Sequence, residues 1–387
     1  MPIKILSVDD ENDLELLLTQ YFRRKIRKEE YEFHFAHNGV EALTMMLQHK
    51  DFDIILSDIN MPEMDGLTLL TKINEMQNPA MKRIMASAYG DMGNIRQAMN
   101  NGAFDFATKP IDLDDLSVTI EKAIEQINYI KQTQQEHNQL ESLKTDLAVA
   151  GEIQQAILPR IFPPFPKYED VLDIAASMTP AKDVGGDFYD FFNIDENRIG
   201  VVIADVSGKG VPAAIFMAVS RTLIRAIGMQ GLAPEECIKR ANELLCKESV
   251  NCMFVTVFYA IYNVKTGEMA YCNAGHNSPY ITHANGKVEV LPMSTNCMIG
   301  AIEGLDFNAG SLTLESGDVF TMFTDGVNEA VNETFEEFGT ERLEATLGRL
   351  QGMDCQKTVE GILSDVKAFA GEAEQSDDIT LLSLKRK

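Results

Sequence analysis

Residues 199–208 read Ile-Gly-Val-Val-Ile-Ala-Asp-Val-Ser-Gly, an apolar run that ends at an aspartate. Such a β-branched run predicts a buried strand, and Asp205 falls where that strand meets a loop. Three other segments combine an apolar run with a terminal carboxylate: Gly-Gly-Asp at 185–187, Phe-Thr-Asp-Gly at 323–326 and Ser-Asp-Asp-Ile-Thr at 376–380. Converging carboxylates need cations to neutralise their repulsion, and oxygen ligands suit Mg²⁺ or Mn²⁺. The pattern therefore predicts a metal site for phosphoryl hydrolysis.

Composition narrows the class of protein. A length of 387 residues predicts two or three domains, and a formal charge of −25 disfavours nonspecific binding to nucleic acid or to an anionic membrane. The six cysteines show no CxxC pairing, which predicts reduced thiols. The N-terminus lacks a signal-peptide pattern, and no apolar run is expected to approach about 18 residues. We therefore expect a cytoplasmic protein.

The first 110 residues alternate short apolar runs with stretches of helix length. This βα repetition predicts a parallel sheet covered on both faces, with ligand-binding residues at the carboxyl ends of its strands. Acidic residues gather at these ends: Asp9 and Asp10 follow the first run and Asp58 the third. Ser87 and Lys109 end the fourth and fifth runs.

Five ordered motifs occupy this region: Val8-Asp9-Asp10-Glu11, Leu56-Ser57-Asp58-Ile59-Asn60-Met61-Pro62, Met64-Asp65-Gly66, Ser87-Ala88 and Thr108-Lys109-Pro110. In these motifs, residues 1–124 resemble a response-regulator receiver domain. The resemblance implies a doubly wound, flavodoxin-like parallel sheet. It also implies a sensor histidine kinase as partner.

The receiver resemblance implies a role for each matching residue. Asp58 would accept the phosphoryl group, while Asp10, Asp58 and the Asn60 carbonyl would hold Mg²⁺, with Asp9 in support. Lys109 and Ser87 would contact the transferred phosphoryl group. Phe106 occupies the position of a switching aromatic, which would turn inward as Ser87 moves.

Residues 112–157 read as one long helix whose middle, 131–138, is polar and rich in glutamine. A two-stranded coiled coil tolerates such a segment, so we expect a homodimer through a coiled-coil linker at 125–158. The alternative is a solvated spacer helix that contacts its own domains. Prolines at 159, 163, 164 and 166 mark the end of the linker.

Beyond the prolines, strand-like runs surround helical patterns and predict a mixed α/β domain at 159–387. Its motifs run in order: Glu-Ile-Gln-Gln-Ala-Ile-Leu-Pro at 152–159, Pro-Ala-Lys-Asp-Val-Gly-Gly-Asp-Phe-Tyr-Asp at 180–190, Ala-Asp-Val-Ser-Gly-Lys-Gly at 204–210, Asn-Ala-Gly-His at 273–276, Thr-Asp-Gly at 324–326 and Asp-Asp-Ile-Thr at 377–380. They resemble bacterial PP2C-like serine/threonine phosphatases of the stage-II-sporulation-E and sigma-factor-regulating branch. The resemblance implies a sandwich of two antiparallel sheets flanked by helices.

The phosphatase resemblance implies two Mn²⁺ or Mg²⁺ ions. Asp205 would bridge them with help from the Val206 carbonyl, and Asp325 and Asp377 would complete the site. Asp187 would support the site, and Asp378 could take the place of Asp377. In related eukaryotic enzymes a histidine stands two residues after the bridging aspartate, where this chain has Ser207.

Three further residues have open roles at this point. Lys182 could contact phosphate, although a surface lysine is the more common outcome, and the same holds for Lys209. His276 invites a catalytic role, but its motif reads more readily as a structural turn between strands.

Taken together, the resemblances imply a phosphorylation-controlled phosphatase. Its substrate would be a phosphoserine or phosphothreonine protein, by resemblance an anti-sigma-factor antagonist, and Asp58 would be the control point. The alternative is a phosphorylation-gated adaptor that binds a partner with little or no turnover. A DNA-binding response regulator would need a basic recognition module, which the acidic second half does not offer.

Overall fold

The computed structural model describes residues 2–49, 51–76, 78, 80–88, 91–248 and 252–387. The chain divides into two compact units, Met1–Ser142 and Leu143–Lys387. The predicted domains 1–124, 125–158 and 159–387 place their boundaries elsewhere, and those boundaries stay a prediction. Each unit is described by itself.

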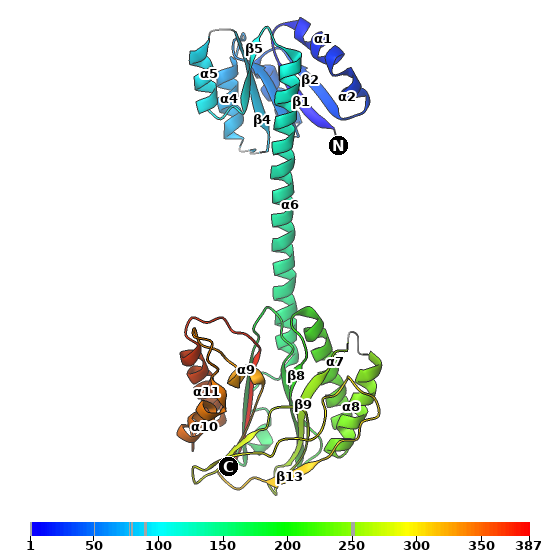
Figure 1. The fold of residues 1–387 in the computed structure, drawn as a ribbon, viewed down its shortest axis with the longest axis vertical. Coiled ribbons are helices and arrows are strands. Elements are labelled where there is room, and N and C mark those ends of the chain that lie inside the picture. The colour runs from blue at the N-terminus through cyan, green and yellow to red at the C-terminus, as the bar shows by residue number, and fades with distance from the viewer. Residues whose placement is uncertain (1, 50, 77, 79, 89–90, 249–251) are drawn as a thin grey trace. The chain divides into compact units, whose positions relative to one another are not determined.

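The first unit is a parallel five-stranded sheet in the order β2-β1-β3-β4-β5, as the alternation of βα units predicted (Figure 1). Its strands are β1 (Ile3–Val8), β2 (Tyr31–Ala36), β3 (Ile54–Asp58), β4 (Lys82–Ala88) and β5 (Asp105–Lys109). Its helices are α1 (Asn12–Tyr21), α2 (Arg23–Arg27), α3 (Gly39–Gln48), α4 (Gly66–Glu75) and α5 (Met92–Asn100). Separate apolar cores cover the two faces of the sheet.

Helix α6 (Leu113–Ile157) is continuous over 45 residues. Its first turns belong to the receiver-like core, because Leu116, Ile120 and Ile127 are fully buried there. Its end belongs to the second unit, where Leu158 directly after the helix joins the main core. The helix thus serves as a core element for each unit at its two ends.

The second unit contains two five-stranded sheets. One has the order β13-β10-β9-β8-β7 and the other β12-β11-β14-β15-β6, and the pairings within both are antiparallel. The first is built from β7 (Phe188–Asn193), β8 (Arg198–Val206), β9 (Val255–Asn263), β10 (Glu268–Ala274) and β13 (Gly310–Thr313). The second is built from β6 (Leu172–Thr179), β11 (Tyr280–Thr282), β12 (Val288–Val290), β14 (Val319–Phe323) and β15 (Ile379–Arg386).

Helices cover the outer faces of this sandwich. Helices α7 (Val211–Gly228) and α8 (Pro234–Glu248) pack on the first sheet, and α10 (Gly339–Arg349) and α11 (Cys355–Ala370) lie beside the second (Figure 1). The short α9 (Asp325–Asn328) follows β14. Apolar side chains such as Phe258 and Phe320 fill the space between the sheets, with their ring centroids 5.7 Å apart. The predicted two-sheet sandwich is confirmed.

One expectation about apolar runs is wrong. Helix α7 has 18 residues with a mean hydropathy of 1.4, so by length and composition alone it could span a membrane. Its apolar character has a local cause, because Ala213, Met217 and Ile224 are fully buried in the main core of the second unit. The run therefore reflects helix packing on the sheet.

Candidate functional site

Three aspartates meet at the carboxyl end of the receiver sheet. Asp9 follows β1 and Asp58 ends β3, and ligand oxygens of Asp9, Asp10 and Asp58 all lie within 4.8 Å of one another. The strands are adjacent and parallel, which is why Asp9 and Asp58, 49 positions apart, share this edge. Gly66 packs so closely on the Asp58 carbonyl that any side chain would collide with it, which explains the glycine of the Met-Asp-Gly motif.

Lys109 lies against this acidic group. Its ammonium is 2.7 Å from Asp58 Oδ2 and 2.9 Å from Asp9 Oδ2. Burial alone would lower the pKa of Lys109, but hydrogen bonds to Asp58 and Asp9 and their charges outweigh burial and raise it. The lysine is therefore a fixed positive charge beside the predicted phosphoacceptor.

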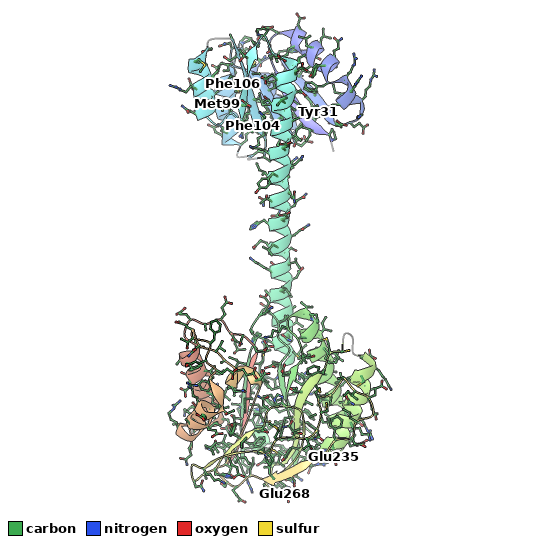
Figure 2. The ribbon with its side chains drawn as sticks, viewed as in Figure 1. Tyr31, Met99, Phe104, Phe106, Glu235 and Glu268 are labelled. Atoms are coloured by element: carbon green, nitrogen blue, oxygen red, sulfur yellow. The ribbon has the colours of Figure 1, made fainter. Side chains whose placement is uncertain are left out.

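The two predicted switch residues lie on the neighbouring strands β4 and β5. Ser87 is fully buried, and its hydroxyl has no hydrogen-bond partner among the described residues. Phe106 lies in β5 with 37% of its surface exposed (Figure 2). The Asn60 amide donates to Asp58 Oδ1 over 3.3 Å, so its backbone also faces the site. An unpartnered buried hydroxyl fits a site that receives an additional oxygen-bearing group.

The second unit brings its aspartates together from both sheets. Asp187 precedes β7 and Asp205 lies near the end of β8, and the pairing of Phe188 with Ala204 sets them side by side. Asp325 opens α9 after β14, and Asp377 precedes β15 in the other sheet. Thr324 joins the two sheets, because its hydroxyl donates to Asp187 Oδ2 over 2.6 Å.

The charges of these aspartates act on one another. Burial first, and Asp325 second, raise the pKa of Asp205 to about 7. Burial followed by the charge of Asp205 raises the pKa of Asp187, and burial followed by Asp377 raises that of Asp325. Their ligand oxygens form no group as tight as the receiver cluster among the residues described. The four aspartates are therefore linked by mutual electrostatic repulsion.

Asp378 differs from its neighbour. Its Oδ1 accepts the Ala181 amide over 2.8 Å, while its Oδ2 accepts the amides of Gly186 at 2.6 Å and Asp187 at 3.3 Å. The carboxylate therefore holds the loop that carries Asp187. A side chain at Gly185 would collide with this carboxylate, which explains one glycine of the Gly-Gly-Asp motif.

Lys209 forms an ion pair with one of these aspartates. Its ammonium lies 2.8 Å from Asp377 Oδ2 and donates to the Ser376 carbonyl over 2.6 Å. The sequence favoured a surface lysine here, and only the fold reveals the ion pair. Lys182, by contrast, is exposed on the loop before Asp187, and its phosphate contact stays a prediction.

His276 lies buried beside the strands. Its Nδ1 is 3.0 Å from the Thr256 hydroxyl, and burial lowers its pKa to about 4. A neutral, enclosed imidazole fits the structural role that the sequence favoured. The Ser207 hydroxyl accepts the Phe254 amide over 2.9 Å, so it is engaged in the loop after β8.

Sequence reasoning missed two residues that support the site. Gln154 lies within a quoted motif, yet nothing in its spacing showed that it contacts the Gly185 backbone. Thr324 precedes Asp325 and was noted only as part of a motif. Gln154 stands four residues after Ala150 and three before Ile157, so it occupies a position on the apolar face of the helix. A polar side chain on that face is the signal that could have identified it.

The donor sets fit divalent cations. Both sites consist of carboxylate and carbonyl oxygens, which hard cations prefer, and in the second unit the carboxylates raise one another's pKa. Gly186 packs against the Val206 carbonyl, so a side chain there would crowd an oxygen predicted to face the metals.

Comparison with known proteins agrees with this geometry. Residues 5–121 match the family "Response regulator receiver domain", and residues 195–387 match "Stage II sporulation protein E (SpoIIE)". Residues 5–121 therefore form a response-regulator receiver domain, and residues 195–387 form a SpoIIE-type phosphatase domain. PP2C-type phosphatases of this kind are metal-dependent, in line with the predicted class of enzyme.

The individual relatives cover the chain to different extents. Phosphoserine phosphatase RsbU of Bacillus subtilis is 29% identical over 268 residues, which span 65% of this chain and 75% of RsbU. Protein IcfG of Synechocystis is 28% identical, spanning 63% of this chain and 42% of IcfG. The SiaA-PP2C domain of Pseudomonas aeruginosa shares the fold at a TM-score of 0.55 and 23% identity, over 64% of this chain and 98% of that domain.

Proposed function

We propose that this response regulator hydrolyses phosphoserine or phosphothreonine in a protein substrate, under control of Asp58 phosphorylation. The observation that supports hydrolysis is the convergence of Asp187, Asp205, Asp325 and Asp377 from two sheets. The name of the relative RsbU, a phosphoserine phosphatase, supports the substrate class. By resemblance the substrate is an anti-sigma-factor antagonist.

In the phosphatase domain, Asp205, the Val206 carbonyl, Asp325 and Asp377 would hold two Mn²⁺ or Mg²⁺ ions. Once bound, such ions neutralise phosphoryl oxygens and activate water for in-line attack. Asp187 helps to keep Asp205 in place, because Phe188 beside it pairs with Ala204 next to Asp205, and Asp187 is itself held by Thr324. Lys209 must give up its pairing with Asp377 or share that carboxylate, since its ammonium faces the same space.

In the receiver, a carboxylate oxygen of Asp58 attacks the phosphorus of the donor, and the bond from phosphorus to the donor's leaving atom breaks, the phosphohistidine nitrogen of a kinase or the acetate oxygen of acetyl phosphate. Asp58 then carries the group as an acyl phosphate. Asp9, Asp10, Asp58 and the Asn60 carbonyl would hold Mg²⁺, which offsets the charge of the transferred group. Lys109 binds the phosphoryl oxygens from its place beside Asp58. The Ser87 hydroxyl then gains a partner, and Phe106 turns inward from its exposed position.

We also propose that a sensor histidine kinase directs phosphorylation and that two chains associate through 125–158. The exposed leucines of α6 support association, since Leu140 and Leu143 are 51% and 59% exposed. Apolar side chains on a long polar helix gain stability when a second helix covers them. A cytoplasmic location and the absence of nucleic-acid partners stay predictions.

The decisive experiment measures Mn²⁺-dependent release of phosphate from a phosphoserine protein by wild type and Asp325→Ala. We expect turnover only by wild type, and a change in its rate after treatment with acetyl phosphate. An Asp58→Ala chain should keep its metal-dependent turnover but lose the response to acetyl phosphate. Equal, metal-independent rates in wild type and Asp325→Ala would instead support the adaptor alternative.

A further inference from the structure

Gln154 in the last turns of α6 forms a two-point contact with one backbone residue. Its side-chain amide donates to the Gly185 carbonyl over 2.5 Å, and the Gly185 amide donates to its Oε1 over 2.9 Å. The side chain is only 6% exposed. A carboxamide offers one donor and one acceptor in a plane, so it pairs with a peptide backbone as a neighbouring strand would.

A second contact lies one helical turn earlier. Gly151 packs so closely against the Asp183 carbonyl that a side chain would collide with it. Gly151 and Gln154 are three residues apart and share a face of α6. The helix therefore touches the loop at 183 and at 185, which fixes both its distance and its rotation against that loop.

The contacted loop leads directly to the metal-site carboxylates. Gly186 and Asp187 follow Gly185, and both donate their amides to Asp378. Asp187 in turn accepts the Thr324 hydroxyl, and Phe188, which follows it, pairs with Ala204 directly before Asp205. A series of hydrogen bonds, peptide links and one strand pairing thus runs from α6 to the aspartate predicted to bridge the metals.

We propose that Gln154 is a positioning residue that latches α6 to the 183–187 loop and thereby sets the geometry of Asp187 and Asp205. The inference rests on the proposed phosphatase function, which it extends to the route by which the linker reaches the site. The contact between Gln154 and Gly185 involves no charged group. Breaking it while the loop stays buried would leave the amide and the carbonyl of Gly185 unpaired, so the loop is either bound to α6 or fully released from it. A displacement of α6 would release the loop and lower metal affinity.

The test compares full-length Gln154→Met, Gln154→Glu and Gln155→Met chains with wild type. Methionine keeps the size of Gln154 but removes both hydrogen bonds, whereas glutamate keeps only the acceptor. Gln155 is exposed on the adjacent position of the same helix and provides the matched control. Hydrogen–deuterium exchange of peptides covering 180–187 is measured without metal, and Mn²⁺ binding is measured by calorimetry. The receiver's contribution to Mn²⁺ binding is determined with Asp325→Asn.

We expect Gln154→Met to raise exchange in 180–187 about tenfold, as follows from two lost hydrogen bonds. We also expect it to weaken Mn²⁺ binding at the phosphatase site by a similar factor, while Gln155→Met matches wild type. Unchanged exchange or unchanged Mn²⁺ affinity in Gln154→Met would overturn the latch. If Gln154→Met does not fold, Gln154→Glu decides by the same two measurements.

The exchange measurement separates the two proposals. Loop protection in the metal-free protein depends on the latch and not on turnover. A chain without phosphatase activity that still shows the Gln154 effect on exchange would retain the contact and reject the function. Normal turnover together with unchanged exchange in Gln154→Met would instead support the phosphatase function and reject the role of Gln154.

Discussion

The Gly186 amide donates to the Asp378 carboxylate over 2.6 Å, although the two residues are 192 positions apart. With the Ala181 amide on its other oxygen, Asp378 has backbone donors at both carboxylate oxygens. Asp377 instead pairs with Lys209. Two adjacent aspartates therefore have separate tasks, one in the loop and one facing the predicted metals.

These separate tasks predict opposite results for Asp377→Asn and Asp378→Asn. The Asp378 change places an amide group against backbone donors and should lower the free energy of unfolding by about 2 kcal/mol. The Asp377 change should alter it by no more than about 0.5 kcal/mol yet abolish Mn²⁺-dependent turnover. Urea unfolding and phosphate release measure both effects. An Asp377→Asn chain with full turnover would contradict the assignment.

Asp325→Asn should stabilise the metal-free protein while removing its activity. Burial and the charge of Asp377 raise the pKa of Asp325, so the ionised carboxylate is disfavoured there. Removal of that charge should raise the free energy of unfolding measured in EDTA. With Mn²⁺ present, wild type should have the higher free energy of unfolding of the two chains. Thermal unfolding with and without the ion tests this reversal, and Gln155→Met provides the control.

Gly151→Ala should destabilise the chain, against the usual trend for helices. In an exposed helix interior this change stabilises by about 1 kcal/mol. Here the new methyl group would collide with the Asp183 carbonyl, so helix or loop must shift. We expect a lower melting temperature and weaker Mn²⁺ binding. The comparison is Gly93→Ala in α5, where a methyl group would meet open space. A rise in melting temperature for Gly151→Ala would contradict the close contact.

His276 should make stability depend on pH. Burial lowers its folded pKa to about 4, below the ordinary value of 6.5. Between these values the unfolded chain binds more protons, so stability falls as pH drops from 6.5 to 4, by up to about 3 kcal/mol. The His276→Gln chain lacks this proton uptake. We expect its unfolding free energy to vary less over that window, measured by urea unfolding at several pH values.

Lys109→Met should reduce phosphorylation of Asp58. The ammonium of Lys109 is 2.7 Å from the Asp58 carboxylate and would meet the incoming phosphoryl oxygens. Charge-assisted contacts of this kind contribute about 2 kcal/mol, so acetyl phosphate should label the variant at least about tenfold more slowly. Phosphate-affinity electrophoresis measures the labelled fraction. Lys72→Met in α4 serves as a control, and equal labelling of Lys109→Met and wild type would contradict the role.

The receiver site was predictable because its fold rule is simple. Asp58 and Lys109 end strands of one parallel sheet and Asp9 directly follows another, and such strand ends share one edge. The long helix was equally predictable, since apolar residues recur at three or four positions on both sides of its polar middle, 131–138. The two-sheet sandwich followed from resemblance rather than from spacing.

Other features depend on contacts that no local pattern encodes. Asp377 and Asp378 are adjacent, and the sequence does not show which of them bonds to the loop. In the structure, Asp378 accepts the Gly186 amide, whereas Asp377 pairs with Lys209. Lys209 has the sequence context of a surface lysine, but a segment far along the chain brings Asp377 to it. The apolar run of α7 was underestimated because arginines near its end interrupt the pattern.

The close fit around Asp378 has an evolutionary consequence. Side chains at Gly185 and Gly326 would both collide with this residue, the first with its carboxylate and the second with its carbonyl. A smaller side chain at 378 would relieve the collision at 185 but not the one at 326, because every residue keeps its backbone carbonyl. Among homologous chains, position 185 should therefore vary only together with 378, whereas position 326 should stay glycine whichever residue stands at 378.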